Sequence, residues 1–172
     1  MKYFSMFTGV GGFDLPMKEL GWECVGVSEI DKYANQVLEH KFKGVKNYGD
    51  ATKIKERELP DFDLLCCGVP CQSWSIAGKR KGFEDPRGTM WNEVFKIVKV
   101  KKPKYLLLEN VKGLLSHNKG KSFEMIAEAI CELGYVLDFT VLNSKFWGVP
   151  QNRERVFILV IRKDLLDKSE II

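Results

Sequence analysis

The 172-residue sequence has few of the residues that build metal centres and disulfide frameworks. It contains two histidines and five cysteines, the latter at positions 24, 66, 67, 71 and 131, with no CxxC pair and no cysteine–histidine cluster. This composition argues against a structural zinc site, and an odd number of cysteines without a signal peptide is typical of reduced thiols. We therefore expect a cytoplasmic protein that binds no metal.

Long apolar runs and a strong charge of one sign are also lacking. No apolar run approaches the roughly 18 residues of a membrane-spanning helix, and Met1–Phe7 does not resemble a signal peptide. The 27 basic and 23 acidic residues give a net charge of +4, which permits binding to a polyanion without requiring it. A chain of this length with 45% hydrophobic residues is expected to fold as a single domain, residues 1–172, without a membrane segment.

Short apolar runs alternate with longer amphipathic stretches, which is typical of βα units around a mainly parallel sheet. The apolar runs predict strands near Tyr3–Met6, Glu23–Val27, Leu64–Cys67, Tyr105–Leu108, Tyr135–Leu142 and Val156–Ile161. The amphipathic stretches predict helices near Phe13–Leu20, Lys32–Phe42, Thr89–Lys99 and Ser122–Leu133. A short edge strand near Val45–Tyr48 is also expected. The pattern indicates an α/β fold.

A glycine-rich turn at residues 7–13 (F-T-G-V-G-G-F) follows the first expected strand and precedes the first helix. Glycines let the backbone pass close to a ligand and direct amide groups toward it. Glu29 ends the next strand, where a carboxylate can accept both hydroxyls of a ribose. These residues predict a nucleoside-containing cofactor, with a tight turn that binds nothing as the alternative. Asp50 is either an acceptor for an adenine amino group or a turn former after Gly49.

Residues 68–75 (G-V-P-C-Q-S-W-S) follow the third expected strand. Ligands of open α/β sheets collect at the carboxyl ends of the strands, which is where this spacing places Cys71. A thiolate at that position would be accessible and reactive, whereas Cys66 and Cys67 are expected to be small core residues within the strand. A buried and inert Cys71 is the alternative.

Two further charged segments lie at the ends of expected strands. Glu109 and Asn110 follow the fourth strand, which brings a carboxyl group within reach of whatever Cys71 attacks; the alternative is a cap of the next helix. Arg153 and Arg155, in residues 151–155 (Q-N-R-E-R), precede the last strand and are otherwise ordinary surface charges.

Together, these four segments resemble the cytosine C5 methyltransferase family, whose pattern reads F-x-G-x-G-G, P-C-Q, E-N-V and Q-x-R-x-R in this order. The resemblance extends from about Tyr3 to Ile161. It implies a Rossmann-like S-adenosylmethionine-dependent methyltransferase fold, with a mainly parallel sheet and a last antiparallel strand. It also implies an S-adenosylmethionine pocket lined by Phe7, Gly9, Gly11, Gly12, Glu29, Ile30, Asp50, Ala51 and Pro70.

The same resemblance implies a reaction on cytosine in double-stranded DNA. Cys71 is expected to add to C6 of a flipped base, while Glu109, as an acid or neutral donor, stabilises N3. Arg153 and Arg155 are expected to hold the base or the catalytic loop, with Arg155 at the base O2. The loop at 73–87 is expected to close over the base. The expected DNA contacts are Gln72, Ser75, Lys79, Arg80 and Lys81.

Family members continue into a target-recognition region and a final segment that returns to the cofactor domain. We therefore expect a split or truncated enzyme of a restriction-modification or phage system, completed by a C-terminal polypeptide. One alternative is a tRNA methyltransferase, disfavoured because residues 69–74 (V-P-C-Q-S-W) lack the P-P-C-Q of that branch and the Pro and Phe that follow it. The others are a non-catalytic cofactor-binding remnant and a nicotinamide dehydrogenase, which the glycine spacing disfavours.

Overall fold

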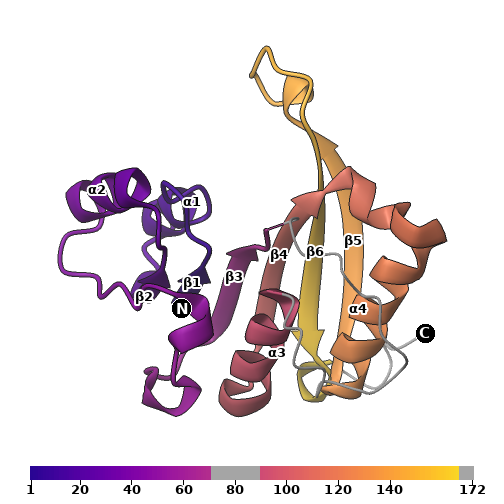
Figure 1. Cartoon of the computed structure of the whole chain (residues 1–172), viewed down its shortest axis with the longest axis horizontal. Coiled ribbons are helices and arrows are strands. Elements are labelled where there is room, and N and C mark those ends of the chain that lie inside the picture. Colours follow the sequence, from indigo (N-terminus) through magenta and orange to yellow (C-terminus); the bar gives the residue numbers. More distant parts are fainter. Residues whose placement is uncertain (71–89, 167–172) are drawn as a thin grey trace. The chain divides into compact units, whose positions relative to one another are not determined.

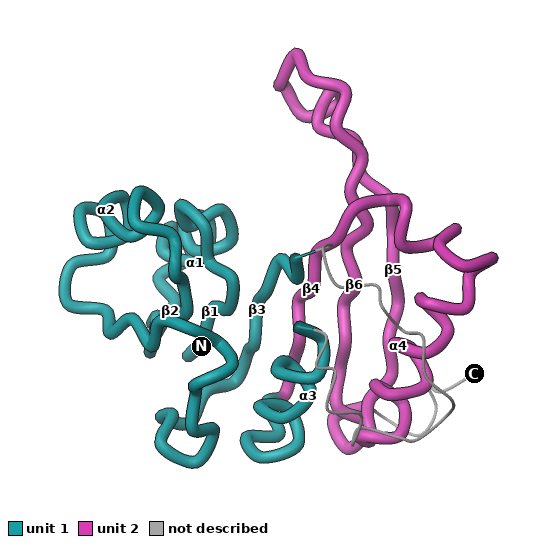
Figure 2. Tube along the Cα trace, viewed as in Figure 1, with its two compact units in different colours: residues 1–103 teal, residues 104–172 magenta. Residues whose placement is uncertain are grey.

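The computed structural model describes residues 1–70 and 90–166, in which strands and helices alternate (Figure 1). The strands are β1 (Lys2–Met6), β2 (Glu23–Ser28), β3 (Leu64–Gly68), β4 (Tyr105–Val111), β5 (Tyr135–Asn143) and β6 (Glu154–Arg162). The helices are α1 (Asp14–Glu19), α2 (Lys32–Lys41), α3 (Met90–Lys101) and α4 (Lys121–Glu132). The chain divides into two compact units, residues 1–103 and 104–172 (Figure 2).

The first unit is built on three parallel strands with β1 in the middle. Tyr3 of β1 lies opposite Cys24 of β2 and Leu64 of β3, and the pairing continues along the strands. Because all three strands run in the same direction, their carboxyl ends meet at one edge of the sheet. The glycine-rich turn after β1, Glu29 after β2 and Val69 after β3 all follow these ends.

Helix α2 begins where the sequence supplies a cap. The Asp31 carboxylate accepts hydrogen bonds from the amides of Tyr33 and Ala34, at 2.9 and 2.7 Å, which satisfies two of the free N–H groups of the first turn. The edge strand expected after this helix, at 45–48, is reduced to a single bridge between Val27 and Asn47. Gly44 and Gly49 flank it with φ of +82° and +67°, which turn the chain away from β2 on either side.

The second unit is built on an antiparallel sheet, in which β6 lies between β4 and β5. Leu106, Leu108 and Ile158 are fully buried, as is Ile130 on the amphipathic helix α4. Burial of each such side chain contributes about 1.5–3 kcal/mol relative to exposure, so this layer accounts for much of the unit's stability. The strands β4 and β5 both oppose β6, which confirms the expected antiparallel last strand and, with the parallel first unit, the α/β class.

Two strands are longer than the sequence predicts. β4 continues through Glu109 to Val111, and β6 starts at Glu154, so that Glu109 pairs with Phe157 and Val111 with Arg155. The placement of Glu109 after its strand, and of Arg155 before its strand, is therefore wrong. Each strand continues because the other strand offers backbone hydrogen-bond partners beyond the apolar run. The side chains of this extension are polar, so the hydrophobic pattern does not predict it.

No helix in the described parts of the chain is long and apolar enough to span a bilayer. The expectation of a single domain stays a prediction.

Candidate active site

The glycine-rich turn is held against the end of β2 by its backbone. Phe7, Gly9 and Gly11 have φ of 51°, 57° and 88°, in the left-handed region that favours glycine. The amide of Thr8 donates to the carbonyl of Ser28 at 3.2 Å, and the Thr8 hydroxyl donates to the same oxygen at 3.4 Å. The non-glycine Phe7 in this region carries strain of about 1–3 kcal/mol, which the surrounding contacts must offset.

The three glycines of the turn have different surroundings. A methyl group added at Gly11 would lie 2.8 Å from Cε2 of Phe42, so this position is closed by packing against the end of α2. The corresponding positions at Gly9 and Gly12 have no atom within 4 Å. Gly9 and Gly12 therefore leave open space beside the backbone, where a ligand can approach closely.

Glu29 is the acceptor that organises this region. Its Oε2 accepts the amide of Gly9 at 2.7 Å, and its Oε1 accepts the amides of Ile30 and Asp31 at 2.8 Å each. A carboxylate has about four acceptor positions, so these bonds occupy three and leave one on Oε2. Glu29 thus fixes the glycine-rich turn and keeps capacity for a ribose hydroxyl.

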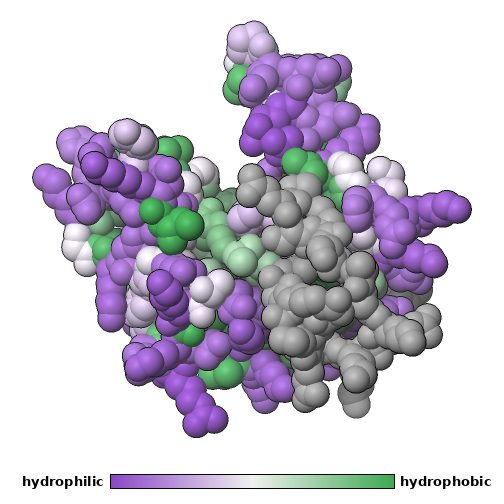
Figure 3. All heavy atoms as spheres, viewed as in Figure 1, coloured by the Kyte–Doolittle hydropathy of each residue, from purple (hydrophilic) through white to green (hydrophobic). Residues whose placement is uncertain are grey.

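Apolar side chains are exposed beside this carboxylate. Ile30 is 74% exposed and Val10, in the turn itself, is 56% exposed. On the face drawn in Figure 3, hydrophobic residues form small patches within a mostly hydrophilic surface. An exposed aliphatic side chain next to a carboxylate with a remaining acceptor position suits the face of an adenine ring, which is apolar.

Asp50 caps a short turn in the described structure. Its Oδ1 accepts the hydroxyl of Thr52 at 2.8 Å and the amide of Thr52 at 3.0 Å, at the start of the 3₁₀ turn Ala51–Lys53. These hydrogen bonds hold the pKa of Asp50 below its usual range. The turn-forming role that the sequence allowed is therefore confirmed, while contacts of Asp50, the buried Ala51 and the exposed Pro70 with adenine stay predictions.

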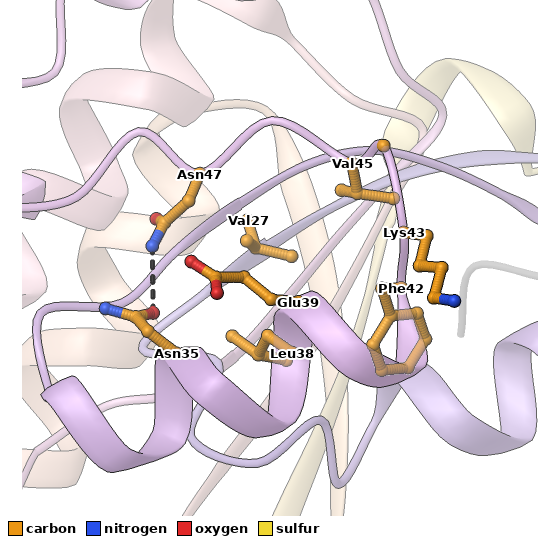
Figure 4. Close-up of a pocket in the computed structure, with 9 residues that line it drawn as sticks. Val27, Asn35, Leu38, Glu39, Phe42, Lys43, Val45 and Asn47 are labelled. Carbon is orange, nitrogen blue, oxygen red and sulfur yellow. Dashed lines mark hydrogen bonds between the residues drawn. The ribbon is translucent and has the colours of Figure 1, made fainter.

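A cavity of about 210 Å³ lies between α2 and the segment that follows it (Figure 4). Its apolar wall comes from Val27, Leu38, Phe42 and Val45. None of the residues predicted to line the cofactor pocket lines this cavity, so we do not assign the cofactor to it.

In the second unit, Glu109 and Arg155 form an ion pair. Nε of Arg155 lies 2.8 Å from Oε1 of Glu109, and the two side chains are 21% and 23% exposed. Arg155 pairs across the sheet with Val111, two residues after Glu109, so the two side chains are diagonal neighbours on one face. This short ion pair holds the Glu109 carboxylate against the Arg155 guanidinium.

The neighbouring motif residues have different surroundings. Asn110 is 2% exposed, on the face opposite Glu109, and its Oδ1 accepts the amide of Val111 at 2.8 Å. Arg153 is exposed in the loop between β5 and β6. The structure therefore brings Arg155, but not Arg153, to Glu109.

Other predicted residues fall outside the described structure. They are Cys71, Gln72, Ser75, Lys79, Arg80 and Lys81. Cys66 and Cys67 are fully buried in β3, which confirms them as core residues, and burial raises the pKa of the Cys66 thiol well above its usual value. Residues 1–70 and 90–166 contain no group of three or more metal-ligating side chains.

The sequence did not reveal two polar residues near this region, one directly after the glycine-rich turn and one beside Glu29. Asp14 is fully buried at the start of α1, where its Oδ2 accepts the Ser5 hydroxyl at 3.1 Å, and burial raises its pKa to about 6. An acidic residue in the first turn of a helix is commonplace, so no pattern marked it. Asn47 makes four side-chain hydrogen bonds next to Glu29. Its position two residues before Gly49 was the only signal, one typical of an Asx turn.

Residues 1–171 match the family described as C-5 cytosine-specific DNA methylase. The chain is 47% identical to orphan methyltransferase M.Rho11sI of Bacillus phage rho11s, over 99% of this chain and 35% of that protein. It is 45% identical to type II methyltransferase M.HhaI of Haemophilus parahaemolyticus, over 96% of this chain and 50% of that protein. It thus spans half or less of the length of these relatives.

The solved structure of the S. pombe Dnmt2 methyltransferase is similar, with a TM-score of 0.76 and 21% identity over 95% of this chain and 51% of that one. This similarity supports the expected methyltransferase fold. With the family match over nearly all of its residues, the chain belongs to the C-5 cytosine-specific DNA methylase family.

Proposed function

We propose that this chain carries the catalytic and cofactor-binding part of a DNA cytosine C5 methyltransferase, with Cys71 as the nucleophile and S-adenosylmethionine as the methyl donor. The observation that carries the proposal is the 2.8 Å ion pair between Glu109 and Arg155. A carboxylate that must meet one ring nitrogen needs a fixed direction, and Arg155 supplies it. Membership of the family supports the class of reaction.

The residues of the first unit fit a nucleoside cofactor. Open space at Gly9 and Gly12 would let the cofactor approach the backbone of the turn. The remaining acceptor position on Glu29 would take a ribose hydroxyl, and the exposed side chain of Ile30 would contact the adenine. S-adenosylmethionine, when bound, supplies a methyl group on a positively charged sulfur, which makes the carbon electrophilic. The role of the described residues is to hold and orient the cofactor.

Cytosine C5 is too weak a nucleophile to accept a methyl group unaided, so the chain must activate the ring. The thiolate of Cys71 adds to C6, and the electron pair of the C5–C6 bond becomes available at C5 for the new carbon–carbon bond. As that bond forms, the methyl–sulfur bond of the donor breaks and its electron pair stays on the departing sulfur. Glu109, acting as an acid or neutral donor, gives a hydrogen bond or its proton to N3 and so stabilises the ring; because Arg155 engages Oε1, we assign this donor to Oε2. A base then removes the C5 proton, and its electron pair restores the C5–C6 double bond as the Cys71 thiolate leaves.

The target base must leave the DNA stack before Cys71 can reach it, at a cost of a few kcal/mol. We assign phosphate contacts to Lys79, Arg80 and Lys81, which give affinity without sequence information, and further DNA contacts to Gln72 and Ser75. We also propose that sequence-specific methylation needs the part of the relatives that residues 1–172 do not match, on the same or on a complementing polypeptide. The proposed location is the cytoplasm of a bacterial cell.

A DNA duplex with 5-fluorocytosine tests the nucleophile, because fluorine cannot leave as a cation and the adduct stays on the enzyme. We expect a covalent adduct at Cys71, located by mass spectrometry, in the presence of S-adenosylmethionine and the complementing part of a relative. Cys71→Ser should form none, whereas Cys131→Ser, which alters an exposed thiol on α4, should react like the wild type. An adduct at a different residue would show that Cys71 is not the nucleophile.

A further inference from the structure

The side chain of Asn47 makes hydrogen bonds to three other residues at once. Its Oδ1 accepts the amides of Glu29 at 3.2 Å and Gly49 at 2.8 Å. Its Nδ2 donates to the carbonyl of Glu29 at 3.1 Å and to Oδ1 of Asn35 at 2.9 Å. Figure 4 shows the Asn35–Asn47 bond at the polar end of the cavity beside α2. An amide side chain has two donor hydrogens and one acceptor oxygen with two lone pairs, so these four bonds use its full capacity.

These bonds replace backbone pairing where the chain leaves β2. Val27 exchanges backbone hydrogen bonds with this segment, donating to Lys46 at 3.0 Å and accepting from Tyr48 at 2.8 Å. Two residues further along the chain, just past the end of β2, Glu29 meets the Asn47 side chain instead, through both its N–H and its C=O. The side chain therefore continues the ladder while the backbone turns away at Gly49, where φ is +67°.

The two segments that Asn47 joins carry the two acidic residues of the cofactor site. One segment carries Glu29, and the other passes through Gly49 directly to Asp50. A second hydrogen bond joins the same two segments, from the Ser28 hydroxyl to the carbonyl of Gly49 at 2.7 Å. The carboxylates of Glu29 and Asp50 each accept a hydrogen bond from an amide of their own segment, so each is held within that segment. What remains to be set is the spacing between the two segments.

We propose that Asn47 is a positioning residue for the cofactor site, whose side-chain amide sets the spacing between the ribose acceptor Glu29 and the adenine-side residue Asp50. This inference rests on the proposed function and extends it to a residue that would not touch the cofactor. Asn35 supports Asn47 from α2, accepting its N–H and donating to the Glu29 carbonyl at 3.3 Å.

The exposure of Asn47 separates a positioning role from a purely structural one. Hydrogen bonds in contact with solvent add little to the free energy of unfolding, because water replaces a lost partner. A small displacement between two ligand-binding carboxylates, in contrast, weakens every contact that depends on both. Replacement of Asn47 should therefore change cofactor affinity more than stability.

Calorimetric titration of the 172-residue chain with S-adenosylhomocysteine tests the proposal. We expect Asn47→Ala to weaken binding about tenfold, the equivalent of one to two lost hydrogen bonds, with little change in the melting temperature. Lys43→Ala, a change in an exposed residue of the same segment, should bind like the wild type. In a Glu29→Gln background, Asn47→Ala should weaken binding less than twofold, because the two residues act through the same contact.

Amide hydrogen exchange measured by NMR supplies a second readout that needs no cofactor. In Asn47→Ala, the amides of Glu29 and Gly49 should exchange faster, while that of Ala34, capped by Asp31, should not change. Unchanged affinity in Asn47→Ala, or full additivity with Glu29→Gln, would overturn the positioning role alone. No binding by the wild-type chain would overturn the proposed cofactor site and this inference with it.

Discussion

Arg155 reaches Glu109 because the antiparallel pairing of β4 with β6 places them diagonally on one sheet face. We expect Arg155→Met to slow adduct formation with 5-fluorocytosine DNA at least tenfold, because the carboxylate loses the group that directs it. Lys112→Met is the matched control, since it removes the 3.0 Å ion pair between Lys112, which directly follows β4, and Glu154 of β6. The rates of covalent trapping of both variants, with the complementing part of a relative present, measure the difference.

The free energy of unfolding distinguishes a role of Arg155 in directing Glu109 from a purely structural one. Both ion pairs are partly exposed, so each should contribute only about 0–1 kcal/mol to the free energy of unfolding. Equal trapping rates for Arg155→Met and Lys112→Met would show that the Arg155–Glu109 pair is an ordinary surface interaction.

Asp14 makes the stability of the chain depend on pH. Burial raises its pKa from 3.8 to about 6, so between these values the folded state binds a proton that the unfolded state has lost. The contribution of this group is therefore fully present below pH 4 and is lost as the pH rises through 6. Two pKa units correspond to a loss on the order of 3 kcal/mol.

Replacement by the neutral isostere isolates this contribution. Asp14→Asn keeps an oxygen that accepts the Ser5 hydroxyl and removes the titration. We expect the variant to gain stability over the wild type as the pH rises from 4 to 7, measured as the free energy of urea unfolding at several pH values. A difference between the two proteins that does not change with pH would contradict the assignment to Asp14.

At the scale of elements, the turn between β1 and α1 has two adjacent glycines with different functions. Gly11→Ala forces a side chain onto φ of +88° and against Phe42, and should destabilise the fold by about 1–3 kcal/mol. Gly12→Ala adds a methyl group in open space, so stability should change little while S-adenosylhomocysteine affinity falls. Urea unfolding and calorimetric titration of both variants separate the two effects. Unchanged affinity in Gly12→Ala would show that the cofactor does not approach this backbone.

The sequence predicted the elements better than their ends. Apolar runs located the six strands of the described residues because buried faces need apolar side chains. They did not predict that β4 continues through Glu109 and Asn110, since this extension depends on backbone partners in β6 more than 40 residues away. Asn47 was missed for the same reason: it is one exposed polar residue whose role depends on where α2 and β2 lie.

At the scale of the whole chain, the motif order predicted the family and the α/β fold, and both are confirmed. Pairing of Arg155 with Glu109 was not predicted, because Arg155 was expected to precede the last strand and two residues in different strands show no spacing signal. The burial of Asp14 was hidden for a related reason, as its partner Ser5 belongs to a different element. Sequence patterns indicate which residues face a core, whereas polar contacts depend on the completed fold.

The charge of the whole chain allows a test of the DNA contacts assigned to residues outside the described structure. With a net charge of +4, the chain should bind DNA of mixed sequence weakly and in a salt-dependent manner. Replacement of Lys79, Arg80 and Lys81 by alanine should reduce the slope of log affinity against log salt by about 2.7, from three lost phosphate contacts. Fluorescence anisotropy at several salt concentrations measures this slope.

The loss of three positive charges would by itself weaken binding to DNA, so the control must remove as many positive charges from another part of the chain. Alanine at Lys32, Lys41 and Lys43, all exposed on or beside α2, makes the same change in net charge. Because loss of long-range attraction changes affinity with little effect on the number of counterions released, this control should keep most of the wild-type slope. If the two triple variants lose the same slope, residues 79–81 are not the phosphate contacts, and the DNA-binding surface has to be sought elsewhere on the chain.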